Sequence, residues 1–209
     1  GRAEFAQKTA DYLRNLLGSV AVDYFLATHY HVDHIGAVPT LLRDHGLVIR
    51  KAVFDRGGNR GELNEAAYRA YFDAISDPAR GLKRVRLRTG DAIDLGPQLS
   101  ARVLSVGDID ARTATGVPVV GENDNSIVLW LTFGKFDYWT GGDLSGEASI
   151  RFADIESAVI PLLPRQADAF KANHHCVDYN NNPQFLAALA PCFARNELRE
   201  NRVEFKWYF

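Results

Sequence analysis

The chain has 209 residues, of which 46% are hydrophobic and 24% charged, and its formal net charge is −2. This composition is typical of a globular protein with one sizeable core, and the charge balance excludes a global electrostatic attraction to nucleic acid or acidic membranes. No apolar run approaches the roughly 20 residues that cross a bilayer. The two cysteines, Cys176 and Cys192, are too few to form a disulfide framework.

The first part of the chain predicts helices alternating with strands. Apolar residues at helical spacing predict an amphipathic helix over residues 4–17, and the apolar run 20–28 predicts a buried strand. A second helix is predicted over 35–44, a second strand over 48–54 and a third helix over 62–76.

From residue 85 onward, short strands predominate, and they are predicted over 85–87, 92–95, 99–106, 126–133 and 136–140. A later strand is predicted over 158–161, with helices near 165–170 and over 183–189. This mixture indicates an α/β protein in which helices cover sheets. Because no Ser/Gly/Pro-rich linker interrupts the sequence, we expect residues 1–209 to form one domain.

Basic and apolar residues alternate over Lys83–Arg88, as in a half-exposed strand. A solvated strand face is the favoured interpretation, and a phosphate-binding strip is the alternative.

The run His29-Tyr30-His31-Val32-Asp33-His34 places four good metal ligands at the carboxyl end of the predicted strand 20–28. Neutral imidazole and carboxylate suit zinc, manganese and iron. His29 and His31 can bind one ion from an extended turn, while Asp33 and His34 turn toward a second ion as the next helix begins. A chance cluster of solvated histidines is the weaker interpretation, because a carboxylate is interleaved with them.

Two ions need further ligands, including a carboxylate between them, because a bridging oxygen offsets the repulsion of two cations. Asp143 is the best candidate, since it follows a predicted strand and the flexible pair Gly141-Gly142. A helix N-cap is the alternative role for Asp143. One of His174 and His175 is expected to bind metal, and the other to contact substrate or act as a general acid.

These residues resemble the metallo-β-lactamase superfamily, whose signature His-x-His-x-Asp-His is present at 29–34 and whose later Gly-Asp is present at 142–143. The final histidine of the superfamily corresponds to His174 or His175, and the match extends from about residue 10 to residue 190. The resemblance implies a four-layer αββα sandwich with two metal ions at one edge of its sheets. It favours His174 as the ligand, which leaves His175 as a catalytic group.

Two segments, Asn123–Leu129 and Tyr138–Asp143, are similar to the ComEC-type hydrolase domains of DNA-uptake proteins. The residues Val53–Gly57 and the His174-His175 pair also fit phosphorylcholine-esterase-like enzymes. These similarities name no substrate.

Two features depart from the superfamily pattern. No histidine lies between positions 45 and 174, so the ligand that usually completes the first metal site is missing, and Asn125, Asp124 or water is the candidate substitute. An oxygen ligand there shifts the metal preference slightly toward manganese. Cys176 stands where related sequences usually have glycine after the paired histidines.

Two bound ions would lower the pKa of a bridging water toward about 7, and Asp33 would orient the resulting hydroxide. A phosphodiester suits this arrangement, and Arg56 is a candidate to bind a phosphate oxygen, although a surface or Asp-paired arginine is the commoner role. We therefore expect a hydrolase with two divalent ions, zinc first and manganese second, acting on a small-molecule or nucleic-acid phosphodiester. The alternatives are hydrolysis of an ester, thioester, lactone or β-lactam, and a non-catalytic metal-binding module.

The superfamily strand that normally precedes Glu4 is absent and the sequence contains no methionine, so we expect the natural polypeptide to be longer. The sequence shows no signal segment. It does not fix a compartment or an oligomeric state. We expect a soluble protein, without membrane insertion in this chain, of the bacterial cytoplasm or exported.

Overall fold

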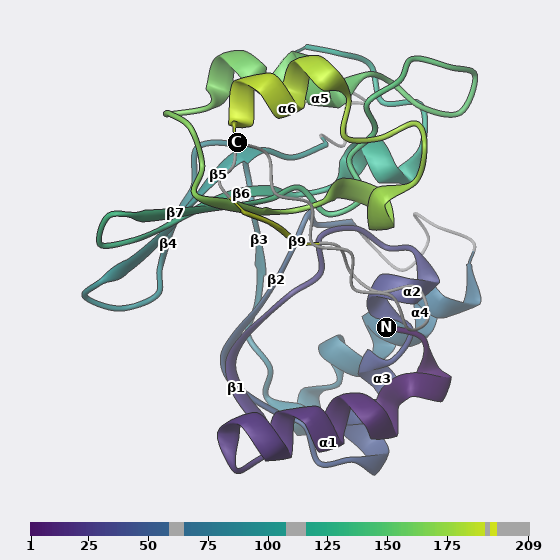
Figure 1. Ribbon diagram of the computed structural model, residues 1–209. Helices are drawn as coiled ribbons and strands as arrows, with labels where there is room; N and C mark the ends of the chain where they lie inside the picture. Colours follow the sequence, from purple (N-terminus) through teal and green to yellow (C-terminus); the bar gives the residue numbers. More distant parts are fainter. Residues whose placement is uncertain (59–64, 108–115, 191–192, 196–209) are drawn as a thin grey trace. The chain divides into compact units, whose positions relative to one another are not determined.

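The computed structural model describes residues 1–58, 65–107, 116–190 and 193–195 (Figure 1). The chain divides into two compact units, Gly1–Arg86 and Leu87–Phe209, and each is described by itself. The prediction of one domain over 1–209 stays a prediction. Residues 62–64 of the predicted third helix and Cys192 lie outside the described residues.

The first unit is a parallel sheet with helices packed on it. Its strands are β1 (Ala21–Leu26), β2 (Val48–Asp55) and β3 (Arg84–Arg86), in the order β1-β2-β3. Its helices are η1 (Ala3–Phe5), α1 (Ala6–Leu17), α2 (Val32–Ile35), α3 (Val38–Asp44), α4 (Ala66–Ser76) and η2 (Pro78–Arg80).

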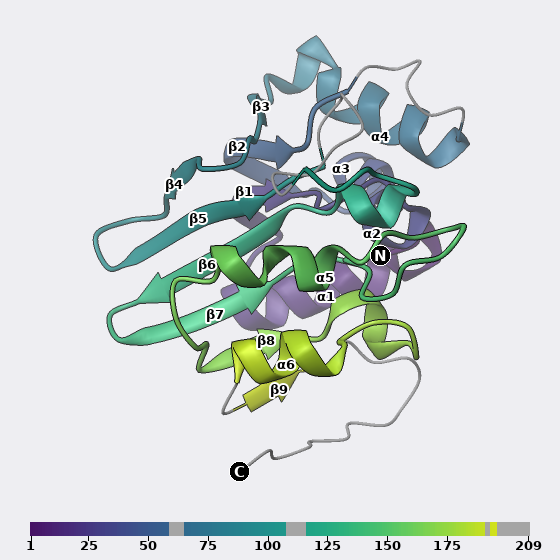
Figure 2. The same ribbon diagram turned by 90° about the horizontal axis from the view of Figure 1, so that it is seen from above.

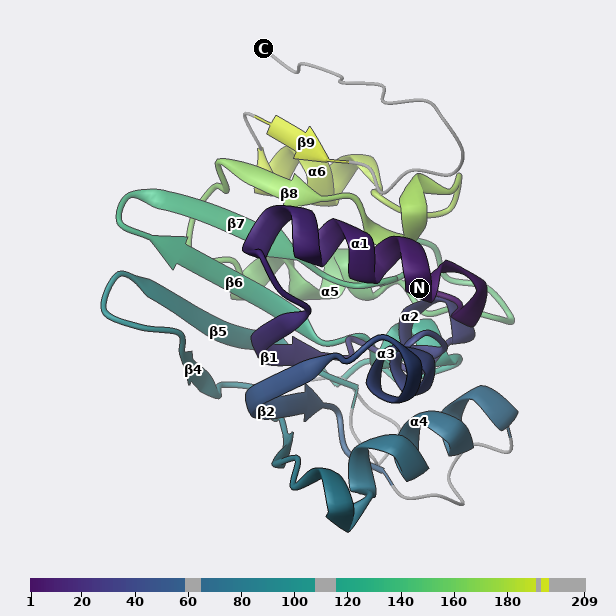
Figure 3. The ribbon, with the colours of Figure 1, turned by 90° about the horizontal axis from the view of Figure 1, so that it is seen from below.

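Parallel strands are usually covered by helices, and the core of the first unit follows this rule. Buried side chains of α1, α3 and α4 join those of β2 in one apolar cluster, and Figure 3 shows these helices beside the sheet. The cluster includes Ala10, Leu41, Val53, Tyr71 and Ile75. This core fixes the end of β1, where the histidine motif begins.

The helix predicted over 35–44 is in fact two short helices, α2 and α3. The first begins at Val32, inside the histidine motif, and ends at Ile35, with Gly36 as its C-cap. A Cβ atom at Gly36 would lie 2.4 Å from the carbonyl oxygen of Val32, so the chain can turn this tightly only with glycine. Pro39 then occupies the first turn of α3, a position that suits proline because its missing N–H has no intrahelical partner there.

The second unit contains a six-stranded sheet with the order β4-β5-β6-β7-β8-β9. Its strands are β4 (Ala92–Asp94), β5 (Leu99–Ser105), β6 (Val128–Phe133), β7 (Phe136–Thr140), β8 (Ala169–Lys171) and β9 (Phe193–Arg195). Its helices are η3 (Glu122–Asn125), α5 (Ile155–Val159), η4 (Ile160–Leu162), η5 (Asn173–Cys176) and α6 (Pro183–Leu189).

The strands β4 to β7 pair antiparallel, and β8 and β9 continue the sheet in parallel. Helices α5 and α6 lie over one face of this sheet (Figure 2). Their buried residues Val159, Phe185 and Leu189 pack with Trp130 and Trp139 of the strands. The carboxyl ends of β7 and β8 therefore lie side by side, and the loops that follow them carry Asp143 and the paired histidines.

Two predictions in this unit are wrong. Residues 158–161, predicted as a strand, belong to α5 and η4, and residues 165–170, predicted as a helix, lead into β8. A short apolar run does not distinguish a strand from a buried helix. The N-cap favours a helix over 155–159, because the carboxylate of Asp154 accepts the backbone N–H of Ser157 at 3.0 Å.

The predicted α/β fold class is confirmed, since both units combine a sheet with helices. Among the described residues, no helix has the length and apolar character needed to cross a bilayer.

Candidate metal-binding residues

Three imidazole rings of the first unit converge where β1 ends and α2 begins. The ring centroids of His29 and His34 lie 4.1 Å apart, and those of His29 and His31 lie 4.9 Å apart in an edge-to-face arrangement. The Nε2 atom of His29 lies 3.1 Å from Nδ1 of His31. His29 is fully buried, while the side chain of Asp33 is 38% exposed and lies 3.8 Å from Nε2 of His34. The four predicted ligands of this motif are thus one cluster.

Tyr30, which separates the first two histidines, anchors the motif from inside the unit. Its ring is buried against those of Tyr68 and Tyr71, with centroid separations of 4.5 and 5.9 Å. Its hydroxyl donates to the carbonyl oxygen of Gly57. Burial raises the pKa of the Tyr30 hydroxyl, so this group keeps its proton and remains a donor. Neighbouring side chains of an extended segment point in opposite directions, so His29 and His31 are expected to face away from Tyr30.

The loop after β2 is held by a partly buried ion pair. Nε of Arg84 lies 2.7 Å from Oδ2 of Asp55, and the hydroxyl of Tyr71 donates to the same oxygen at 3.1 Å. Burial lowers the pKa of Arg84, but the hydrogen bond to Asp55 and the negative charge of Asp55 raise it by more. Arg84 belongs to the basic stretch Lys83–Arg88, so at least this member of the stretch pairs within the protein instead of forming a solvated face.

Arg56, the predicted phosphate-binding residue, lies in the interior of the first unit. It is 3% exposed, and its guanidinium carbon lies 4.5 Å from the centroid of the Tyr30 ring. A stacked, buried guanidinium contributes to packing of the motif. The substrate-binding role of Arg56 stays a prediction.

In the second unit, Asp143 follows β7 and is 1% exposed. Its backbone N–H donates to Oγ of Ser126 at 3.1 Å, and Nζ of Lys171 lies 3.9 Å from its Oδ1. The next described helix, α5, begins only at Ile155, so the N-cap alternative for Asp143 is wrong. A Cβ at Gly141 would lie 2.6 Å from Oδ1 of Asn173, which explains why the approach to Asp143 needs glycine.

Both paired histidines turn toward Asp143. Nε2 of His175 lies 3.3 Å from Oδ2 of Asp143, and Nε2 of His174 lies 3.9 Å from the same oxygen. They stand on a left-handed turn, with φ of 46° at His174, 54° at His175 and 62° at Cys176. The backbone N–H of His174 donates to the carbonyl oxygen of Gly142 at 3.2 Å, which joins the turn to the Asp143 loop.

Asn123, which the sequence interpretation did not single out, contacts His174. Its Nδ2 lies 3.3 Å from each ring nitrogen of His174, and its buried Oδ1 has no hydrogen-bond partner among the described residues. Oδ2 of Asp124 accepts backbone N–H groups, including that of Ala153 at 3.0 Å, while its buried Oδ1, like that of Asn123, has no hydrogen-bond partner among the described residues. Asn125 donates to Glu122 at 3.1 Å. Of the three, Asn123 is therefore the side chain in contact with the histidine cluster.

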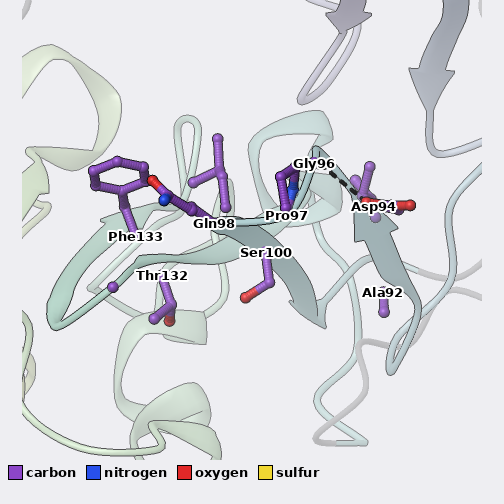
Figure 4. A pocket seen from close by; sticks show the side chains of 11 residues that line it. Ala92, Asp94, Gly96, Pro97, Gln98, Ser100, Thr132 and Phe133 are labelled. Carbon is purple, nitrogen blue, oxygen red and sulfur yellow. Dashed lines mark hydrogen bonds between the residues drawn. The ribbon is translucent and has the colours of Figure 1, made fainter.

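A hollow of the second unit lies away from these histidines. It encloses about 750 Å³ at the turns that join β4 to β5 and β6 to β7, and Figure 4 shows Phe133, Thr132 and Gln98 around it. These turns are at the opposite ends of β6 and β7 from Asp143. Its one described titratable lining residue is Asp94, which caps the turn by accepting the N–H of Gly96 at 3.0 Å. This hollow offers no set of ligands or catalytic groups.

The donor atoms of each cluster fit a divalent ion. Two nitrogen ligands of one tetrahedral zinc lie about 3.3 Å apart at bonds of about 2.05 Å. The separations of 3.1 Å between His29 and His31 and 3.3 Å between His175 and Asp143 are close to this value.

No family model matches the chain, and no curated protein matches its sequence. Solved structures do resemble it. A mutant of the CmlA beta-hydroxylase has a TM-score of 0.50 and 14% identity, over 83% of this chain and 36% of that one. A new diphosphatase from the PhnP family has a TM-score of 0.46 and 15% identity, over 88% and 62%. The metallo-beta-lactamase fold protein YhfI from Bacillus subtilis has a TM-score of 0.45 and 16% identity, over 77% and 54%.

The chain spans between 36% and 62% of the length of these three structures. At identities of 14% to 16%, the similarity concerns the fold alone. It agrees with the α/β class that the sequence predicts.

Proposed function

We propose that this chain is a metal-dependent hydrolase that binds two divalent ions and acts on phosphodiesters. The observation that carries this proposal is the convergence of His29, His31 and His34, with ring nitrogens of the first two only 3.1 Å apart. This separation, with one imidazole fully buried, supports the proposal that both rings bind one ion.

The proposed ligand set draws on both clusters. It consists of His29, His31, Asp33, His34, Asp143 and His174. Oxygen and nitrogen donors in this proportion suit zinc first and manganese second. Asn123 supplements the set we expected from the sequence, because a buried amide oxygen without a hydrogen-bond partner is a candidate for the missing ligand.

The hydrogen bonds of His174 favour it as a ligand through Nε2. Nδ2 of Asn180 donates to the carbonyl oxygen of Leu144, which leaves Oδ1 of Asn180 as the atom facing Nδ1 of His174 at 3.1 Å. Since an amide oxygen can only accept, Nδ1 carries the proton. The lone pair of His174 is then on Nε2, which faces Asp143.

The remaining groups take the following roles. Bound metal ions would supply a hydroxide at neutral pH by lowering the pKa of water. Asp33, whose side chain is 38% exposed, orients the attacking oxygen. His175, 3.3 Å from Asp143, donates a proton to the leaving oxygen.

A phosphodiester is the proposed substrate class because two ions stabilise the attacking and the leaving oxygens of an in-line displacement together. The similarity of Asn123–Leu129 and Tyr138–Asp143 to ComEC-type domains, and of Val53–Gly57 to phosphorylcholine-esterase-like enzymes, supports this choice. It leaves open a nucleic-acid or a small phosphodiester.

A substrate panel tests the proposed reaction. The chain, stripped with a chelator and reloaded with Zn²⁺ or Mn²⁺, is assayed with bis-p-nitrophenyl phosphate, a lactone and a chromogenic β-lactam. We expect turnover of the phosphodiester that is lost by at least about 100-fold in Asp33→Ala. Asp44→Ala, which removes an exposed carboxylate of the same unit, is the matched control and is expected to retain the rate.

Each other result has a defined meaning. Turnover of the lactone or the β-lactam alone would show that the enzyme attacks a carbon centre and not phosphorus. A fully metal-loaded chain without turnover of any of the three substrates would point to a non-catalytic metal-binding module.

A further inference from the structure

Three consecutive residues with side chains adopt left-handed backbone angles at the candidate site. His174 has φ 46° and ψ 49°, His175 has φ 54° and ψ 23°, and Cys176 has φ 62°. This conformation brings Cβ close to the following carbonyl oxygen and is unfavourable for any residue except glycine. Such backbone persists only where surrounding contacts hold it, so something must hold this turn.

One buried carboxylate, that of Glu156, joins the two ends of the turn. Before the turn, Nδ2 of Asn173 donates to Oε1 of Glu156 at 2.9 Å. After the turn, the backbone N–H of Asn181 donates to Oε1 and that of Asn182 to Oε2, each at 2.7 Å. Residues 173 and 181 are thereby tied to one fixed group, which restrains the segment between them.

Glu156 itself sits on a rigid support. It is fully buried in α5, and its backbone N–H donates to the carbonyl oxygen of Ser145 at 3.0 Å. A Cβ at Gly146 would lie 2.1 Å from its Oε2, so the carboxylate occupies space that only glycine leaves open. Asn182 also donates to Oδ1 of the N-cap residue Asp154 at 3.2 Å. The carboxylate therefore has a fixed place relative to the turn.

We propose that Glu156 is a positioning residue, which holds the left-handed turn so that Nε2 of both His174 and His175 faces Asp143. This inference rests on the proposed function, because it assigns Glu156 a role in metal binding by His174 and Asp143. Glu156 accepts hydrogen bonds from Asn173, Asn181 and Asn182, and it acts on the proposed ligands through these residues.

The test compares Glu156→Gln with wild-type protein. Glutamine keeps the size of the side chain but replaces one acceptor oxygen by an NH2 group, which cannot accept from the N–H groups that face it. Glu147→Gln makes the same chemical change at an exposed position of the same unit and is the matched control. Cobalt replaces the native metal as the probe, because its visible spectrum reports the geometry of the ligands.

We expect Glu156→Gln to weaken Co²⁺ binding by about tenfold or more and to change the cobalt spectrum, as loss of a group that orients ligands does elsewhere. Glu147→Gln is expected to leave both unchanged. A Glu156→Gln protein that is less stable but binds Co²⁺ with unchanged affinity and spectrum would show that Glu156 is merely structural and would overturn the inference.

Hydrogen exchange of the metal-free chain separates this inference from the proposed function. The amide of His174, bonded to Gly142, and that of Val177, bonded to His174, report the turn directly. We expect both to exchange at least about tenfold faster in Glu156→Gln, and unchanged exchange would contradict the role of Glu156 even if the wild type bound no metal. If Glu156→Gln does not fold, Asn173→Ala takes its place, since it removes the hydrogen bond from the Asn173 side chain to Oε1 of Glu156 at 2.9 Å. The same faster exchange and weaker Co²⁺ binding are then expected, and their absence contradicts the inference.

Discussion

The carboxamide oxygen of Asn180 lies 3.1 Å from Nδ1 of His174, and the amide group of the same side chain donates to the carbonyl oxygen of Leu144. This orientation favours a proton on Nδ1 of His174, because an amide oxygen can only accept. No sequence pattern singles out Asn180, but its hydrogen bond supports the proposal that His174, and not His175, binds metal.

Replacing Asn180 by alanine should therefore weaken metal binding without removing a ligand. We expect an affinity for Zn²⁺ about 10- to 100-fold lower, because the ring of His174 loses the partner that fixes its tautomer. Competition with a chromogenic chelator measures this change. Asn15→Ala, on the exposed face of α1, is the control, and an equal affinity of the Asn180 and Asn15 variants would contradict the assigned tautomer.

The left-handed turn makes a prediction about Cys176, an exposed residue with φ of 62°. Left-handed backbone costs a residue with a Cβ about 1–2 kcal/mol, whereas glycine loses about 0.5–1 kcal/mol more entropy on folding. Cys176→Gly should therefore be more stable than Cys176→Ala, by about 0.5–1 kcal/mol in urea unfolding. A more stable alanine variant would show that the turn is not left-handed at this position.

Tyr30→Phe tests the anchor of the first cluster. The variant removes the hydroxyl that donates to Gly57 and accepts from Arg84 at 3.3 Å, so a buried carbonyl oxygen loses its donor. We expect the free energy of unfolding to fall by about 1–3 kcal/mol. Tyr12→Phe, at a position 60% exposed, is the control and should change stability by less than about 0.5 kcal/mol. Equal stability of Tyr30→Phe and wild type would contradict the anchor.

The pH dependence of stability tests the burial of Glu156. Burial raises its pKa above 4.5, although hydrogen bonds from Asn173, Asn182 and Asn181 lower it. The unfolded chain then releases this proton at lower pH than the folded chain does. Stability therefore falls as pH rises from 4.5 through the folded pKa.

The difference in unfolding free energy between wild type and Glu156→Gln isolates this effect, because other groups cancel. We expect the advantage of wild type to shrink as pH rises through that window. An advantage that grows with pH would mean that the charged carboxylate is the better fit, with a lowered pKa.

Much of the fold follows from local signals in the sequence. Helical spacing over 4–17 gives α1, and the short strand before His29 gives β1, because both patterns extend over whole elements. The strand predicted over 158–161 and the helix predicted over 165–170 are wrong, since a short apolar run fits a buried helix as well as a strand. Only the capping bond of Asp154 decides between them.

The candidate ligands could be predicted because they form a compact motif, whereas their supports could not. Glu156 lies 17 positions from Asn173 and shares no periodic pattern with it. Tyr30 looks like a spacer between two histidines, and only its hydrogen bond to Gly57 reveals the anchor. Cys176 was the one sequence signal for the left-handed turn, because it stands where related sequences usually have glycine.

Elemental analysis of metal content tests the central claim most directly. The reloaded and desalted chain should hold about two divalent ions, and His29→Ala and Asp143→Asn should each hold about one or fewer. Asp178→Asn, an exposed carboxylate near the paired histidines, should keep both ions. Less than one ion per chain in the wild type, or full occupancy in both ligand variants, would contradict the proposed metal site.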